Sequence, residues 1–290
     1  MDWLARDFRQ NLGSPPTFSA TMATTALFYP DLQKLTDDPF LKAIPDIVGP
    51  PTSKGHRLSP RFVERQIALA AMLYEVADQA WAVELCHRFS KQTFRSVYYE
   101  AHAMAFMRKM GFALSFAPTT GVRGNDFEFS AKIGDSIAFV EVSASELETF
   151  SKSNVYNKLK KKKSRLPASG SGIIIIALPE NTDVIADPIR SELAETCQSF
   201  FNTAPNVRYV FFLHEIVDQS DNQSIRVGLT RFINPSASER IADLDGAVES
   251  FTTPRMSHQR DQYFAEGYRL FTLIEELERI TPVAPTSSGD

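Results

Sequence analysis

Two acidic residues lie in segments whose alternating patterns predict neighbouring β-strands. Asp126 begins the segment DFEFSAKI, and Glu141 follows fifteen residues later, near the end of SIAFVEVSA. The short turn Gly134-Asp135 would make these strands antiparallel neighbours, so the two carboxylates can approach each other at one end of a sheet. Mg²⁺ prefers a few carboxylates together with water and substrate phosphate. The spacing therefore predicts a magnesium site, which could lower the pKa of a water molecule and stabilise charge on a phosphoryl oxygen.

The surroundings of these acids favour a site over a solvated surface. Glu141 lies in a strand of apolar or small residues, where a carboxylate is costly unless it is paired or binds a metal. Glu100 lies on the same helical stripe as apolar residues and also points toward the core. For Asp126, a simple turn role after Gly124-Asn125 is the alternative, and for Glu100 an ion pair with an arginine. Glu128 is expected to be a solvated strand residue.

The run from Glu100 through GNDFEF (124–129) to VEVS (140–143) resembles the signature of the PD-(D/E)xK nuclease superfamily, the restriction-endonuclease-like proteins. The resemblance covers 95–178, roughly a third of the chain. It implies that Asp126 and Glu141 hold Mg²⁺ or Mn²⁺, aided by the backbone carbonyl of Val142. Glu100 would be an outer or second-metal ligand. The implied activity is metal-dependent hydrolysis of phosphodiester bonds, as in a DNA endonuclease.

One position departs from this family pattern. The motif lysine, which orients the attacking water and stabilises developing charge, is replaced by Ser143. Serine is uncharged and too short to do the same, so the resemblance implies that Lys158 or Lys160 of the following predicted helix reaches back over the site. The alternative is a catalytically impaired module that binds nucleic acid or a protein partner.

Basic residues near these acids supply candidate phosphate contacts. They are Arg123 in the loop PTTGVRGN and the run of Lys160, Lys161, Lys162 and Lys163. Each lysine close to a nucleic-acid backbone adds salt-dependent affinity. The lysine run could equally be a solvated helix face, and Arg123 could pair with an acid. The predicted partner is nucleic acid, with DNA as the first candidate.

The elements that must position these residues follow from hydrophobic periodicity. Helices are expected over 60–90, 93–109, 153–165, 188–202 and 257–279, and strands over 112–117, 126–133, 136–144, 173–177, 208–216 and 225–232. From residue 93 the order is α-β-β-β-α-β and then α-β-β, which predicts a mixed sheet with helices on both sides. The predicted class is α/β, a restriction-endonuclease-like core with helical additions at both ends. The predicted regions are 1–92, a core over 93–235, a helical region over 236–280 and a disordered tail over 281–290.

Composition excludes several other classes. A net charge of −4 argues against a basic protein that coats DNA nonspecifically. The two cysteines, Cys86 and Cys197, form no zinc or disulfide pattern. The start of the chain lacks the apolar region of a signal peptide, and no P-loop, dinucleotide or hydrolase motif occurs. We therefore expect a soluble cytoplasmic protein that does not bind membranes. The aromatic-rich helices over 60–90 and 257–279 leave a homo-oligomer or a protein partner open.

Overall fold

The computed structural model describes residues 79, 81, 92–116, 122, 124, 126–143, 150–179, 182, 184, 186–217, 225–238 and 242–250. The chain divides into two compact units, and nearly all of these residues belong to the second unit, Arg95–Met256. The predicted helix over 257–279, the tail over 281–290 and Arg123 lie outside the described residues. Gln79 and Trp81, the only described part of the predicted 60–90 helix, form a bend and a turn.

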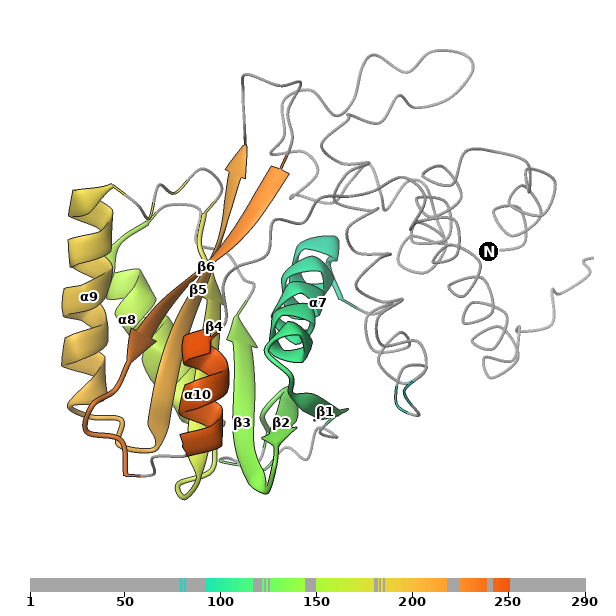
Figure 1. Ribbon diagram of the computed structural model, residues 1–290. Helices are drawn as coiled ribbons and strands as arrows, with labels where there is room; N and C mark the ends of the chain where they lie inside the picture. The colour runs from blue at the N-terminus through green and yellow to red at the C-terminus, as the bar shows by residue number, and fades with distance from the viewer. Residues whose placement is uncertain are drawn as a thin grey trace, which may run out of the picture. The chain divides into compact units, whose positions relative to one another are not determined.

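The described part of the chain alternates helices and strands in the expected order (Figure 1). The elements are α7 (Phe94–Lys109), β1 (Ala113–Phe116), β2 (Phe129–Ile133), β3 (Ser136–Ser143), α8 (Lys152–Lys163), β4 (Ser171–Ala177), α9 (Asp187–Phe201), β5 (Val207–Val217), β6 (Ile225–Ile233) and α10 (Ala242–Ser250). The predicted order from residue 93 through residue 232 is therefore confirmed. The added element is α10, within the region expected to be helical. Among the described helices, none is long and apolar enough to cross a membrane.

The six described strands form one mixed sheet in the order β1-β2-β3-β4-β5-β6. Strands β1, β2 and β3 pair antiparallel, β3, β4 and β5 pair parallel, and β6 pairs antiparallel with β5. Strands β2 and β3 are joined by the two-residue turn Gly134-Asp135, whereas the parallel strands are joined through α8 and α9. The predicted α/β class with a mixed sheet is therefore confirmed.

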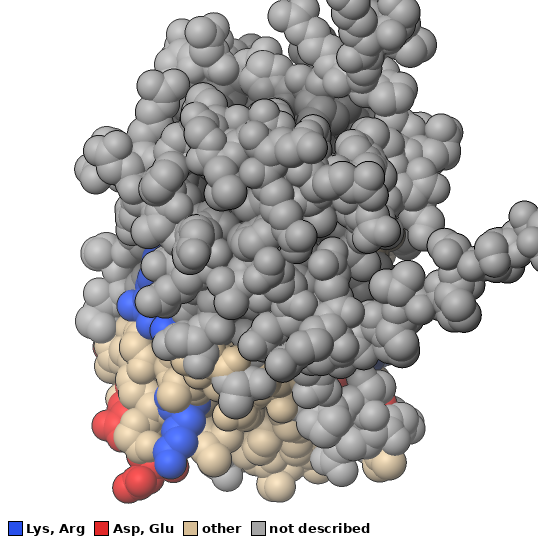
Figure 2. Space-filling view, turned by 90° about the vertical axis from the view of Figure 1, so that its right-hand side faces the viewer, with Lys and Arg blue, Asp and Glu red and all other residues tan. Residues whose placement is uncertain are grey.

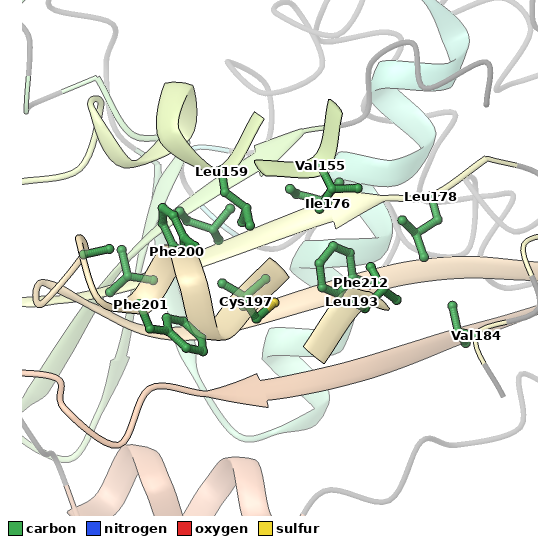
Figure 3. Packing of buried hydrophobic residues seen from close by; sticks show 14 of the residues in the cluster. Val155, Leu159, Ile176, Leu178, Val184, Leu193, Cys197, Phe200, Phe201 and Phe212 are labelled. Carbon is green, nitrogen blue, oxygen red and sulfur yellow. The ribbon is translucent and has the colours of Figure 1, made fainter. Parts of the chain in front are cut away.

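Helices α8 and α9 cover one face of the sheet. The crossovers β3-α8-β4 and β4-α9-β5 run in the same direction across the sheet. Because such crossovers are almost always right-handed, we expect both helices on the same side. Their buried side chains pack with Ile174, Ile176, Val210 and Phe212 of the central strands (Figure 3). Helices α7 and α10 lie on the other side of the sheet (Figure 1). Strand β4 is buried along its whole length, as its β-branched run predicts.

The start of β2 differs from the prediction. The strand begins at Phe129, opposite Val140, and not at Asp126. The Glu128 amide still donates to the Val140 carbonyl (3.0 Å), but the Asp126 amide donates to the carbonyl of Arg165 (3.3 Å), just after α8. Asp126 thus precedes the strand because its backbone pairs with a different part of the chain.

Candidate functional site

Glu141 lies inside the sheet, on the face covered by α8. It is two residues from the end of β3 and pairs in register with Ile174 of β4. Its side chain has no exposed surface. A carboxylate in such a position needs an opposite charge, because burial removes the water that would otherwise solvate it.

The opposite charge comes from Lys162 in the last turn of α8. The helix begins at the Ser151 cap, whose side chain accepts from the Asn154 amide, and it buries Val155 and Leu159 against the sheet. Lys162 follows Leu159 by three residues and so continues the buried stripe. Its Nζ lies 2.7 Å from Oε2 of Glu141, and its side chain is 13% exposed.

Two further charged side chains complete this group. Lys162 Nζ lies 3.7 Å from Oε1 of Glu128. An Arg165 guanidinium nitrogen lies 3.8 Å from Oε1 of Glu128 and 3.8 Å from Oε1 of Glu141. We call Glu128, Glu141, Lys162 and Arg165 the carboxylate cluster. It brings two acidic and two basic side chains together between strands β2 and β3 on one side and the end of α8 on the other.

The electrostatics of the carboxylate cluster are set mainly by burial. Burial raises the pKa of Glu141 to about 7, with Lys162 acting in the opposite direction. Glu128 raises this pKa further, and Arg165 lowers it. Glu141 can therefore change its charge near neutral pH, which is unusual for a glutamate.

The predicted acids do not all meet at this place. Within the described ranges, no group of three or more His, Cys, Asp and Glu side chains could hold a metal ion. Glu100 is buried on α7, and half-buried Asp126 touches the cluster through its backbone bond to Arg165. Glu128 was expected to be solvated, but its side chain is only 17% exposed and is the acid that shares Lys162 with Glu141. The reason is that the residues before β2 turn toward the end of α8.

The motif positions of β3 remain next to this cluster. Ser143, which replaces the motif lysine, is the buried last residue of β3 and pairs in register with Ile176. Val142 is buried between it and Glu141. Neither residue carries a positive charge, so the positively charged side chain beside Glu141 must come from another element.

The lysine run splits into different environments. Lys160 and Lys161 are exposed, and Lys160 lies over the ring of Tyr156. Lys163 donates to the Thr203 carbonyl. Lys158 and Lys160 are the predicted substitutes for the motif lysine, but the lysine that pairs with Glu141 is Lys162. The sequence predicts Lys162 only as part of a phosphate-contacting or solvated helix face. Buried Val155 and Leu159 mark the side of α8 that faces the sheet, and both Lys158 and Lys162 lie on that side.

Comparisons with known proteins give no family for this chain. No protein-family model matches it, and no curated protein matches it. The central domain of yeast acetyl-CoA carboxylase is a listed structural match, at 10% identity and a TM-score of 0.32. The match covers 76% of this chain and 34% of the carboxylase chain. So low a structural similarity carries no argument about fold or function.

Proposed function

We propose that this protein is a metal-dependent phosphodiesterase acting on nucleic acid, built on a restriction-endonuclease-like core. The observation that carries the proposal is the buried Glu141 of β3, paired at 2.7 Å with Lys162 of the following helix. The acid stands where the family resemblance expects it. The lysine supplies the charge that Ser143 lacks, from an adjacent element.

The order of elements supports the restriction-endonuclease-like core. A helix, three antiparallel strands, a crossover helix and a parallel buried strand follow one another as α7, β1, β2, β3, α8 and β4. This is the order that the resemblance implies. Glu141 lies on the third strand and Glu128 directly precedes the second, and the crossover helix ends beside them with its basic last turn.

The proposed divalent cation would need ligands beyond the two carboxylates of the cluster. Glu128 and Glu141 offer carboxylate oxygens at one point, and Mg²⁺ needs few protein carboxylates because it retains water and binds substrate phosphate. Asp126, Glu100 and the Val142 carbonyl are the further ligands that the resemblance suggests. Bound Mg²⁺ or Mn²⁺ would supply an activated water and stabilise charge on a phosphoryl oxygen.

The side chains of this protein have separate roles in the proposal. Lys162 holds a fixed positive charge beside the carboxylates. Such a charge would stabilise negative charge that develops on the phosphoryl group, and the effect is stronger where little water is present. Exposed Lys160 and Lys161 on the same helix would contact the nucleic-acid backbone and position it. On the face in Figure 2, the described surface is mainly uncharged, with a few basic and acidic side chains.

A plasmid-nicking assay with Mg²⁺ or Mn²⁺ tests the proposal. Glu141→Gln and Lys162→Met should each lower the nicking rate by at least about 100-fold, since each removes a group acting on the transition state. Lys152→Met is the matched control, because it removes an exposed lysine from the first turn of the same helix and should keep most of the activity. Equal nicking by wild type, Glu141→Gln and Lys162→Met would refute the proposal.

The second candidate is a nuclease-like module without catalysis that binds nucleic acid or a protein partner. It is favoured by Lys162, whose Nζ already neutralises Glu141 at 2.7 Å, and by Ser143 at the motif position. Calorimetry with Mg²⁺ or Mn²⁺, followed by the nicking assay, separates the two candidates. Metal binding without nicking would favour the non-catalytic module. Recovery of nicking when Ser143→Lys is added to Lys162→Met would favour the enzyme.

A further inference from the structure

The two bases of the carboxylate cluster are held differently. Lys162 is 13% exposed and makes one close contact, 2.7 Å from Glu141. Arg165 is 44% exposed, and its contacts with Glu128 and Glu141 are both 3.8 Å. A distance of 3.8 Å is beyond hydrogen-bond range. Arg165 is therefore attracted to the carboxylates without being fixed to them.

The charge balance of the cluster depends on this loosely held side chain. Above about pH 7, where Glu141 is ionised, Glu128 and Glu141 carry two negative charges, and Lys162 and Arg165 carry two positive charges. A neutral cluster attracts a divalent cation weakly. Moving Arg165 away leaves one net negative charge beside the same carboxylate oxygens, which favours cation binding.

We propose that Arg165 is a counter-ion that responds to phosphate. Together with Lys162 it neutralises the two carboxylates in the free protein, and it turns outward to a phosphodiester of bound nucleic acid, which opens the carboxylates to a divalent cation. This inference rests on the proposed function. A guanidinium forms paired hydrogen bonds with phosphate, a better geometry than its two 3.8 Å contacts here.

The position of Arg165 supports this exchange. It follows the end of α8 directly, next to exposed Lys160 and Lys161, where a nucleic-acid backbone is proposed to lie. Its main chain is anchored, because its carbonyl accepts from the Asp126 amide and its amide donates to the Lys162 carbonyl. Only the side chain needs to move, and Lys162 stays with Glu141. By linkage, nucleic acid and cation would then strengthen each other's binding.

Calorimetric titration of Ca²⁺ into the full chain, with and without a short DNA duplex, tests this coupling without a need for cleavage. In the wild type, DNA should raise the affinity for Ca²⁺ about tenfold, or about 1.4 kcal/mol. Arg165→Ala and Arg165→Gln should each bind Ca²⁺ about tenfold more tightly without DNA and show little further gain with it. Arg190→Ala, which removes an exposed arginine of α9, should behave as wild type.

Two results would overturn the inference. One is a wild-type Ca²⁺ affinity that DNA does not change. The other is an Arg165→Ala or Arg165→Gln variant, folded by circular dichroism, with wild-type Ca²⁺ affinity and wild-type coupling. Either result leaves the proposed function standing if metal-dependent nicking is present in the wild type and lost in Glu141→Gln. Absence of that nicking counts against the proposed function, even where coupling to DNA is measured.

Discussion

Two groups of charged side chains lie on opposite faces of the sheet, and they are built differently. On the α8 side, the carboxylate cluster has one contact of 2.7 Å and three of 3.7–3.8 Å. On the α10 side, Arg208 binds Asp245 with two hydrogen bonds, of 2.6 and 3.0 Å, and donates a third to the Asn234 carbonyl at 2.6 Å. Tyr209 also donates to Asp245. We call this second group the α10 clamp.

The α10 clamp owes its geometry to an irregularity in the sheet. Val207 pairs with Gly172 and Tyr209 with Ile173, so Arg208 is an extra residue in β5. At such a bulge two successive side chains can leave the strand toward one side. Arg208 and Tyr209 can therefore both reach Asp245 of α10.

This difference separates a structural group from a candidate site. In the α10 clamp both oxygens of Asp245 are hydrogen-bonded and the arginine donors have fixed partners. In the carboxylate cluster, burial raises the pKa of Glu141 to about 7 despite its lysine. A buried acid with a perturbed pKa in a loosely held group is a candidate for a functional residue. The four predictions that follow test this contrast, from the largest expected effect to the smallest.

Asp245→Ala should destabilise the fold by about 3 kcal/mol, because it leaves the buried Arg208 without its carboxylate. Urea unfolding measures the loss. Asp243→Ala, an exposed acid in the same helix turn, is the control and should cost under about 1 kcal/mol. Nicking by the folded Asp245→Ala variant should remain. Unchanged stability would show that the α10 clamp is not a structural group.

Glu141→Gln should remove a pH dependence from stability. The pKa of Glu141 is raised from 4.5 to about 7 in the folded protein, so the folded state holds this proton more tightly. Protonated Glu141 therefore contributes its full stabilisation below about pH 4.5, and this stabilisation is lost as pH rises through about 7. Relative to Glu141→Gln, the wild type should lose on the order of 2–3 kcal/mol across this window.

Urea unfolding of both proteins between pH 4.5 and pH 8 measures this difference. Parallel stability curves would contradict a raised pKa at Glu141. Metal-dependent nicking should increase through about pH 7, since the carboxylate is the form that binds a cation.

Lys162→Met should destabilise the protein by about 2 kcal/mol at pH 8 and by much less at pH 5. At the higher pH Glu141 is charged and loses its close partner, whereas at the lower pH it is protonated. Unfolding at the two pH values gives the comparison, and Lys161→Met is the control. An equal loss at both pH values would indicate lost packing and not lost charge.

Tyr209→Phe should cost about 1 kcal/mol, the usual net value of one hydrogen bond. The effect is small because Arg208 still holds both oxygens of Asp245. Thermal unfolding measures it, and nicking should be unchanged. A loss of nicking at unchanged stability would assign the α10 clamp a part in the reaction.

The sequence determined the order of the elements and the interior position of Glu141. Alternation with a period of two identified β3, and the β-branched run identified β4 as buried on both faces. These are local properties, because the side-chain period follows from the backbone of each segment. The same reasoning indicated that so enclosed an acid needs a partner.

Only the tertiary structure decided which residues meet. Lys158 and Lys162 lie on one side of α8, four residues apart, so periodicity cannot distinguish them. One helical turn, about 5.4 Å along the axis, separates them, and the packing of α8 on the sheet decides that Lys162 reaches Glu141. Likewise, Glu128 and not Asp126 joins the cluster because the chain before β2 pairs with the segment after α8. Which residues of two elements come into contact depends on how the elements pack, and a local sequence pattern does not contain that information.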